Sequence, residues 1–135
     1  MKTWEFDSWQ KFEEFVRDVF ESYEFETQFR VVFRDDMGKS EIDVLACKGK
    51  LVLAIDAKRY TGGWYRLSAV KREAKKHAER CRRYSKLSGR EVIPILVPLI
   101  DDGIVSCGGC LIVPMRALRD FLSNIEYYLT LFGYL

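Results

Sequence analysis

Two β-rich segments, residues 41–48 and 51–58, are separated by a two-residue loop whose first residue is Gly49. Glycine in the first position of such a loop is typical of a tight type II′ turn between antiparallel strands. A turn of this kind fixes the register, because Lys48 must then pair with Leu51 and every other pair follows from that one. This hairpin is the feature of the sequence that most narrows the choice of fold.

The predicted register places charged side chains opposite one another. Asp43 lies directly across from Asp56, and Glu41 lies across from Lys58. Facing residues on antiparallel strands have Cβ atoms about 5 Å apart, so two facing carboxylates repel each other unless a cation compensates them. The pairing therefore favours a bound metal ion. The competing interpretation is a set of solvent-facing charges, in which Glu41 and Lys58 form an ordinary cross-strand salt bridge.

Alternation along the second strand of the hairpin separates charged from apolar side chains. Asp56 and Lys58 share one face, and the hairpin brings Asp43 to that same face. Cleavage of a phosphodiester bond near neutral pH requires oxygen ligands for Mg²⁺, which usually binds one or two carboxylates together with phosphate and water. Two carboxylates beside one ammonium group therefore predict a metal-dependent nuclease site. The opposite face of the strand points to the core and carries Leu53, Ile55 and Ala57.

Hydrophobic periodicity predicts the rest of the fold. With 48% hydrophobic residues, a chain of 135 residues is expected to form one α/β domain, a mixed β-sheet flanked by helices. Its core covers roughly residues 9–100, and the apolar extension 101–135 either closes the core or forms a subunit contact. The expected helices are 9–23, preceded by the N-cap Ser8, then 67–86 and one that begins at Pro114; the further strands are 29–33, 91–100, 104–106 and 111–113.

Positive charge is concentrated in one segment. Between Arg66 and Arg90 there are ten Lys or Arg residues and two Glu, which gives this segment a net charge of +8 in a chain whose total is +2. Such a split suggests a polyanionic partner that touches one region, although charge runs are usually just solvated helix faces. The nucleic-acid contacts we expect are Arg59, Tyr60, Lys71, Arg72, Lys75, Lys76, Arg80 and Arg83.

Several residues permit two interpretations. Trp64 and Tyr65 follow the charged strand and suit either stacking on exposed bases or anchoring of a loop. His77, the single histidine, is expected to contact solvent or phosphate rather than to act as a catalytic base. Cys107 and Cys110 have CxxC spacing, but no second close pair accompanies them, so a structural role is favoured over a local disulfide or redox pair.

The charged hairpin resembles the core of the PD-(D/E)XK nuclease superfamily, in particular the Mrr-like restriction endonucleases and the archaeal Holliday junction resolvases. The resemblance is carried by the segments SEIDVLA (residues 40–46) and LVLAIDAKRY (residues 51–60), and by FEEFV (residues 12–16), which is similar to the first-helix signature of that group. It covers roughly residues 9–100 in order and spacing. It implies a restriction-endonuclease-like mixed sheet.

The resemblance also implies roles for individual residues. Asp43 and Asp56 would bind Mg²⁺ or Mn²⁺ together with the backbone carbonyl of Ala57, and Lys58 would position the attacking water or stabilise charge. Glu13 would join through a water molecule or a second metal ion. The chain departs from the commoner pattern in having Asp rather than Glu at Asp56, and the shorter side chain could move the metal or weaken its binding.

Helical geometry favours Glu13 over Glu14 as the third acid. At about 100° per residue, Glu13 lies at the border of the apolar stripe of its helix, whereas Glu14 points toward solvent. The resulting hypothesis is a metal-dependent endonuclease that cuts DNA. RNA is not excluded as a substrate, and assembly into a homodimer is a further hypothesis. The alternative is a non-catalytic nucleic-acid-binding module or interaction subunit with an inactive nuclease fold. No segment has the uninterrupted apolar length of a membrane span or signal peptide, so a cytoplasmic location is expected.

Overall fold

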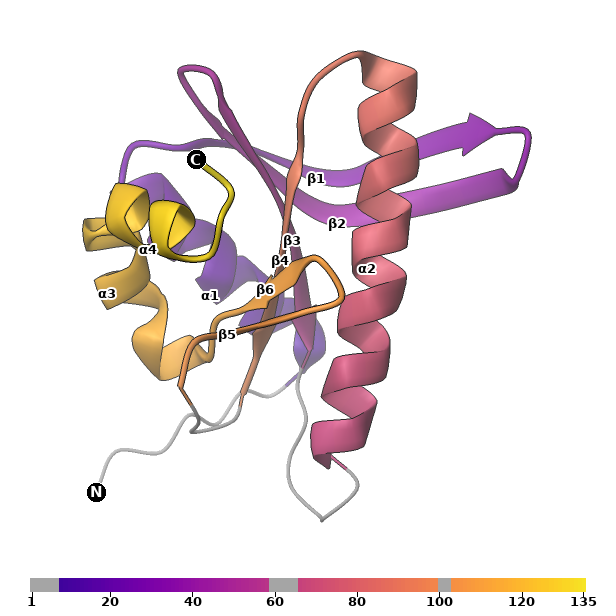
Figure 1. The fold of residues 1–135 in the computed structure, drawn as a ribbon. Helices are drawn as coiled ribbons and strands as arrows, with labels where there is room; N and C mark the ends of the chain where they lie inside the picture. Colours follow the sequence, from indigo (N-terminus) through magenta and orange to yellow (C-terminus); the bar gives the residue numbers. More distant parts are fainter. Residues whose placement is uncertain (1–7, 59–65, 100–102) are drawn as a thin grey trace.

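A mixed six-stranded sheet runs through the centre of the molecule in the order β1-β2-β3-β4-β6-β5 (Figure 1). β2 runs antiparallel to both β1 and β3, whereas β4 runs parallel to both β3 and β6, and β5 is antiparallel to β6. The computed structural model describes residues 8–58, 66–99 and 103–135. Its elements are α1 (Trp9–Ser22), β1 (Glu26–Asp35), β2 (Gly38–Lys48), β3 (Leu51–Lys58), α2 (Arg66–Ser88), β4 (Ile93–Pro98), β5 (Val105–Cys107), β6 (Cys110–Ile112), the short 3-10 helix η1 (Met115–Ala117), α3 (Leu118–Ser123) and α4 (Ile125–Leu131).

Helices cover both faces of the sheet. On one face, α1, α3 and α4 surround an apolar cluster in which Phe12, Phe121 and Leu129 are fully buried (Figure 1). On the other face, the long helix α2 packs Val70 and Cys81 against two smaller apolar clusters. The expected fold class, an α/β domain with a mixed sheet flanked by helices, is confirmed.

The hairpin between β2 and β3 has the register that its loop predicts. Lys48 pairs with Leu51, and the ladder continues without a slip to the pair Val44–Ile55. Gly49 adopts a left-handed φ of 60°, which is the conformation that its place in the turn requires. The turn chemistry therefore fixes the relation between the two strands that carry the predicted acids.

The strand expected over residues 29–33 is longer in the structure, where β1 extends from Glu26 to Asp35. Within the described residues, β1 lies at the edge of the sheet and pairs with β2 alone. Its exposed residues alternate with half-buried ones and with the buried Phe33. An edge strand of this kind needs no apolar run, which explains why hydrophobicity underestimated its length. β4, expected over 91–100, is the shorter segment Ile93–Pro98.

The β1–β2 ribbon is distorted at Arg30, and the side chains of β1 pack on opposite faces of the sheet before and after this residue. The two strands pair regularly on both sides of this residue, but the pair Arg30–Asp43 is missing from the ladder. Arg30 has a left-handed φ of 57°. Phe29 packs with the α1 side of the core, whereas Val31 and Phe33 pack with the α2 side, although an undistorted strand would put all three on one face. The distortion thus turns the outer half of the ribbon toward α2.

Arg83 of α2 anchors the far end of this ribbon. Its guanidinium donates two hydrogen bonds to the Asp35 carboxylate, at 2.8 and 2.6 Å, and a third to the carbonyl of Gly38 at 2.9 Å. The Arg83 guanidinium lowers the pKa of Asp35 below its ordinary value. A bidentate arginine–carboxylate pair gives this contact a defined geometry, so α2 and the ribbon are held at a fixed spacing.

The CxxC segment forms the turn between β5 and β6. Cys107 and Cys110 face each other across the turn, and both are free thiols. Burial raises the pKa of Cys110 well above its usual range, which keeps its thiol protonated. Gly108 has a φ of 61°, and a Cβ atom there would lie 2.6 Å from Cγ of Lys75. The two glycines therefore serve a close approach to α2, in agreement with the structural interpretation of this motif.

The C-terminal segment closes the core with one face only. Leu129 of α4 is fully buried, whereas Tyr127, Leu131 and Leu135 are more than half exposed. Its end is fixed by a hydrogen bond of 2.6 Å from the Tyr134 hydroxyl to the carbonyl of Gly109. Within the described residues, no helix combines the length and apolar character needed to span a membrane.

Candidate active site

Asp43 and Asp56 meet at the open end of the β2–β3 hairpin. The last pair of the ladder is Val44–Ile55, so each acid lies one residue beyond it. The two carboxyl groups are hydrogen-bonded to each other. Asp56 is 1% exposed, and Asp43 is partly buried. The structure thus brings together the two acids that the predicted register placed opposite each other.

The surroundings of this pair favour the protonated form of Asp43. Burial, followed by the hydrogen bond and the charge of Asp56, raises the pKa of Asp43 to about 8. Lys58 acts in the opposite direction and lowers this pKa. Two carboxylates in contact cannot both ionise readily in a buried site, so the pair holds one proton when no other cation is present.

Glu13 of α1 is buried close enough to the acidic pair to feel the charge of Asp56. Its side chain is 2% exposed, and its Oε1 accepts a hydrogen bond of 2.8 Å from Arg30. Burial raises the pKa of Glu13, the charge of Asp56 raises it further, and Arg30 lowers it. The neighbouring Glu14 is exposed, as the helical angles predicted. Of the two acids, Glu13 is therefore the one that lies near the pair.

Arg30 belongs to the site although sequence reasoning did not select it. Besides Glu13, its guanidinium lies 3.6 Å from Oε1 of Glu41 and 4.8 Å from the centre of the Trp9 ring. Its left-handed backbone is a conformation that costs about 1–3 kcal/mol in a residue other than glycine and that occurs preferentially at functional sites. No local sequence signal marks this position, because its partners come from α1 and β2.

Lys58 lies between an acid of the sheet and an acid of α2. Its Nζ is 3.6 Å from Oδ1 of Asp56 and 3.6 Å from Oε1 of Glu73. Oε2 of Glu73 is in turn 3.7 Å from Nζ of Lys76. Glu41, which the register places opposite Lys58, forms the ion pair with Arg30 described above. The ammonium group of Lys58 is thus held beside the acidic pair by Asp56 of β3 and Glu73 of α2.

The expectation for His77 is wrong. Instead of contacting solvent or phosphate, His77 is fully buried between α2 and β3. Its Nε2 lies 2.8 Å from the carbonyl oxygen of Ala54, and its Nδ1 lies 3.1 Å from NH1 of Arg80. Burial lowers its pKa, so the ring is neutral. The burial was detectable, because Val70, Ala74, His77 and Cys81 follow one another at helical spacing on the packed face of α2.

Two buried oxygens of the acidic residues lack a hydrogen-bond partner. Among the described residues, Oε2 of Glu13 and Oδ2 of Asp56 are shielded from solvent and accept no hydrogen bond. Unpaired buried carboxylate oxygens are unfavourable unless something neutralises them. Hard oxygen donors of this kind are the ligands that Mg²⁺ and Mn²⁺ prefer. The residues present therefore fit a divalent cation.

The acids are not arranged as a complete set of three ligands. Within residues 8–58, 66–99 and 103–135, no group of three or more His, Cys, Asp or Glu side chains is positioned to hold one metal ion. Glu13 is paired with Arg30 instead of being directed at Asp43 and Asp56. The arrangement supplies two carboxylates to a common point and a third carboxylate close by, and Mg²⁺ usually takes only one or two from a protein.

The predicted nucleic-acid contacts lie mostly on α2. Lys71, Arg72, Lys75 and Lys76 are exposed, and Arg80 is half-buried with its NH1 3.7 Å from Oδ2 of Asp56. Arg83 is committed to the ribbon through Asp35. The expected contacts Arg59 and Tyr60, and the aromatic residues Trp64 and Tyr65, lie outside the described residues. The basic face and the acidic pair are therefore adjacent through Arg80.

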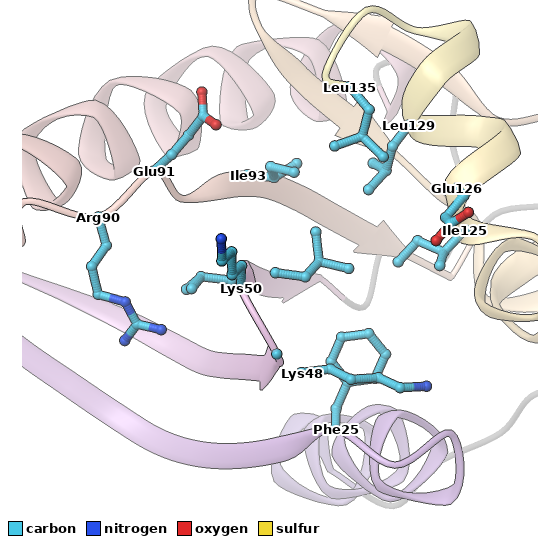
Figure 2. Close-up of a pocket in the computed structure, with 13 residues that line it drawn as sticks. Phe25, Lys48, Lys50, Arg90, Glu91, Ile93, Ile125, Glu126, Leu129 and Leu135 are labelled. Carbon is cyan, nitrogen blue, oxygen red and sulfur yellow. The ribbon is translucent and has the colours of Figure 1, made fainter.

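A cavity of about 800 Å³ lies at the turn end of the hairpin, away from the acidic pair. Figure 2 shows Lys50 on one side of it and Leu129 and Leu135 of the C-terminal segment on the other. Among the described residues that line it, Glu91 and Glu126 supply the carboxylates, and the others are cationic, apolar or glycine. None of the predicted catalytic residues lines it, so we do not place the chemistry there.

Solved structures of other proteins were found that align with this chain. No family model matches the sequence. The crystal structure of a protein of unknown function, AF1548, aligns with a TM-score of 0.59 and 16% identity over 90% of this chain and 77% of that one. The two chains therefore share a fold. The small subunit of the heterodimeric restriction endonuclease R.BspD6I aligns with a TM-score of 0.42 and 13% identity, over 93% of this chain and 98% of that one.

Comparison of sequences identifies a relative. An uncharacterised protein of Archaeoglobus fulgidus is 48% identical over 127 residues, which cover 94% of this chain and 98% of the relative. Identity at this level over nearly the full length of both proteins establishes common family membership. The chain belongs to the same family as this uncharacterised archaeal protein.

Proposed function

We propose that this chain is a metal-dependent nuclease of the PD-(D/E)XK type that hydrolyses phosphodiester bonds in DNA. The observation that carries the proposal is the buried acidic pair of Asp43 and Asp56, which shares a hydrogen bond beside the ammonium group of Lys58. The resemblance of residues 9–100 to that superfamily agrees with this arrangement, because the helix, the three antiparallel strands and the second helix occur in the same order.

Each residue has a distinct role in this proposal. Asp43 and Asp56 would hold Mg²⁺ or Mn²⁺ together with the backbone carbonyl of Ala57, and Glu13 would assist through a water molecule or a second metal ion. When bound, the divalent ion lowers the pKa of water and offsets the negative charge that develops on the phosphate. Lys58 orients the attacking water, because its ammonium group is held at a fixed position by Asp56 and Glu73. Asp43 must release its proton before it can act as a ligand.

The basic face of α2 provides a surface for the DNA backbone. Its exposed lysines and arginines lie on the same helix as Arg80, which approaches Asp56 to 3.7 Å, so a strand that follows α2 passes the candidate site. Contacts with phosphates position a nucleic acid without reading its sequence. We therefore expect the shape of the DNA backbone, rather than its base sequence, to determine where the enzyme binds at this surface.

One observation favours a second function, a nucleic-acid-binding module without catalysis. Glu13 forms an ion pair with Arg30, and the described residues provide no preformed set of three metal-ligating side chains. A protein whose acids served only to fix the ribbon would retain the basic face and bind DNA in a salt-dependent way. The two functions differ in their response to divalent ions, since only the nuclease requires them.

The direct test is a cleavage assay over linear, nicked, flapped and four-way DNA substrates and an RNA duplex, with Mg²⁺ or Mn²⁺ and with EDTA. We expect cleavage of at least one DNA substrate that EDTA abolishes and that Lys58→Ala reduces by about 10²–10⁴-fold. Lys50→Ala, which removes a lysine at the opposite end of the same strand pair, is the matched control and should retain activity. Equal activity of Lys58→Ala and wild type would contradict the mechanism. DNA binding without cleavage under any divalent ion would favour the module.

A further inference from the structure

We propose that a hollow between α2 and β2 binds one backbone phosphate of the DNA and that the buried His77 orients Arg80 for this contact. This inference rests on the proposed function and names a subsite for its substrate. The hollow has a volume of about 410 Å³ and lies beside the acidic pair, to which Arg80 connects it. Its lining residues are Ser40, Lys75, Lys76, Glu79, Arg80 and Arg83.

The charges that line the hollow favour an anion. Four of the six lining residues are cationic, and the one acid, Glu79, forms an ion pair with Arg82. Arg83 is engaged by Asp35, and Lys76 lies 3.7 Å from Glu73. The hydroxyl of Ser40 adds a neutral donor. A single anionic group with several oxygen acceptors, such as a phosphate, matches this set of donors.

Arg80 occupies the boundary between the hollow and the acidic pair. It is 24% exposed, and its NH1 lies 3.7 Å from Oδ2 of Asp56, which is too long for a hydrogen bond. Oδ2 of Asp56 indeed has no hydrogen-bond partner among the described residues. Arg80 therefore neutralises Asp56 at a distance and keeps most of its five N–H donors for another acceptor. A phosphate bound to Arg80 would lie next to the proposed catalytic acids.

His77 determines which way Arg80 points. The carbonyl oxygen of Ala54 can only accept, so Nε2 of His77 must donate to it, at 2.8 Å. In a neutral ring, Nδ1 then carries a lone pair and accepts from NH1 of Arg80 at 3.1 Å. The ring is fully buried and fixed to β3, two residues before Asp56. His77 is thus a positioning residue: it is hydrogen-bonded to β3 and to Arg80, and it holds the guanidinium of Arg80 at a defined place relative to β3.

The turn between β5 and β6 restricts a second cationic side chain of the hollow, that of Lys75. Because Gly108 has no side chain, Lys75 can pass directly against it, where a Cβ atom would approach Cγ of Lys75 to 2.6 Å. This contact restricts the side chain of Lys75, which is one of the lining residues. Two cations of the hollow, Lys75 and Arg80, are therefore held by neighbouring elements rather than free in solvent.

The experiment measures binding without cleavage. The affinity of a fluorescently labelled 20-base-pair duplex is determined by anisotropy at several salt concentrations in EDTA, for wild type, Arg80→Gln and Lys86→Gln. Lys86 lies on the same helix but does not line the hollow, so its replacement controls for loss of one charge. We expect Arg80→Gln to weaken binding by about 10-fold and to reduce the slope of log K against log salt by about 1, as loss of one phosphate contact does. We expect a much smaller effect of Lys86→Gln.

The role of His77 is tested by a double-mutant cycle. His77→Gln keeps a donor for the Ala54 carbonyl, but its flexible amide oxygen does not occupy the Nδ1 position that accepts from Arg80. It should therefore weaken binding although the net charge is unchanged. Because the histidine acts through Arg80, the variant with both replacements should bind no more weakly than Arg80→Gln alone. Should His77→Gln fail to fold, Arg80→Lys replaces it in the comparison. That variant retains the charge without the planar fork, and it should bind more weakly than wild type.

The outcomes separate this subsite from the nuclease activity. If Arg80→Gln binds as well as Lys86→Gln, the hollow is not a phosphate site, whatever the cleavage assays show. If the effects of His77→Gln and Arg80→Gln are additive, or Arg80→Lys binds like wild type, His77 does not position Arg80. A protein that binds DNA through Arg80 but never cleaves it would overturn the nuclease proposal and leave the subsite in place.

Discussion

The two ends of the β2–β3 hairpin are built on different physical principles. At the turn end, five consecutive residue pairs join the strands, and side chains such as Leu53 and Ile55 are completely buried in apolar surroundings. At the open end, the ladder stops after Ile55, and the next side chains are the hydrogen-bonded acids Asp43 and Asp56. One end therefore stabilises the fold, whereas the other places charge where burial makes it unfavourable.

The difference shows where the chain departs from the regular pattern of a stable protein. Arg30, opposite Asp43, is left-handed, and buried oxygens of Glu13 and Asp56 accept no hydrogen bond among the described residues. Strained backbone and unsatisfied polar groups persist where binding or catalysis uses them. These three features gather at the open end, although Glu24 is also left-handed and Nε of Arg17 is also buried without a hydrogen-bond partner among the described residues.

The sharpest test of the comparison replaces one residue from each end. Asp56→Asn removes a proposed ligand and should reduce cleavage by at least about 10³-fold, while the protein stays folded. Leu53→Ala should lower the free energy of unfolding by about 2–5 kcal/mol, because it leaves a cavity in the core. Below its melting temperature this variant should cleave like wild type. Cleavage rates and thermal unfolding of the two variants check both expectations. The comparison fails if Asp56→Asn retains full activity.

A second test uses two adjacent acids of α1. Glu13→Gln should reduce cleavage by about 10-fold or more, because it removes the charge of the buried carboxylate near the acidic pair. A 10-fold loss corresponds to about 1.4 kcal/mol of transition-state stabilisation. Glu14→Gln carries the same change on the exposed side of the helix and should have no effect. Steady-state kinetics of both variants distinguish them. Equal effects would remove Glu13 from the site.

The turn end can be weakened without touching the chemistry. Gly49 has a φ of 60°, and nothing lies within 4 Å of the position that a Cβ atom would occupy. Gly49→Ala should therefore cost only the backbone strain of a left-handed residue, about 1–2 kcal/mol. Chemical denaturation measures this loss, and the cleavage rate of the folded variant should be unchanged. A large loss of activity would show that the two ends are not independent.

The pH dependence of stability reports on the open end in the metal-free protein. Because the pKa of Asp43 is raised to about 8, the folded state binds more protons than the unfolded state between about pH 4 and pH 8. The acid therefore destabilises the fold increasingly as pH rises through that window. In EDTA, Asp43→Asn should raise the melting temperature at pH 8 by about 3 °C or more and have little effect at pH 4. The same gain at both pH values would contradict the shifted pKa.

The regular part of the site could be predicted from the sequence because it depends on local rules. A glycine at the first loop position determined the register, and the register determined which acids meet. The helical period determined that Glu13 rather than Glu14 is buried. In each case, the relevant geometry is set within one element or one turn, so neighbouring residues contain the information.

The remaining part depends on contacts between distant segments. Arg30 was missed because its partners Glu13 and Glu41 come from other elements and its left-handed conformation is not encoded by its residue type. The interpretation of His77 failed for a different reason: charge dominated the view of α2, although the helical spacing already placed this residue on the packed face. The contact of Glu73 with Lys58 likewise requires knowing that α2 lies over the end of β3.

The most direct test of the central claim is Mn²⁺ binding measured by isothermal titration calorimetry at pH 7 in buffers of different ionisation enthalpy. The account predicts that wild type binds Mn²⁺ and releases a proton, because the ion displaces the one that Asp43 shares with Asp56. It also predicts at least a 10-fold loss of affinity in Asp43→Asn and none in Glu14→Gln. Mn²⁺ affinity that is the same in wild type and Asp43→Asn would contradict it.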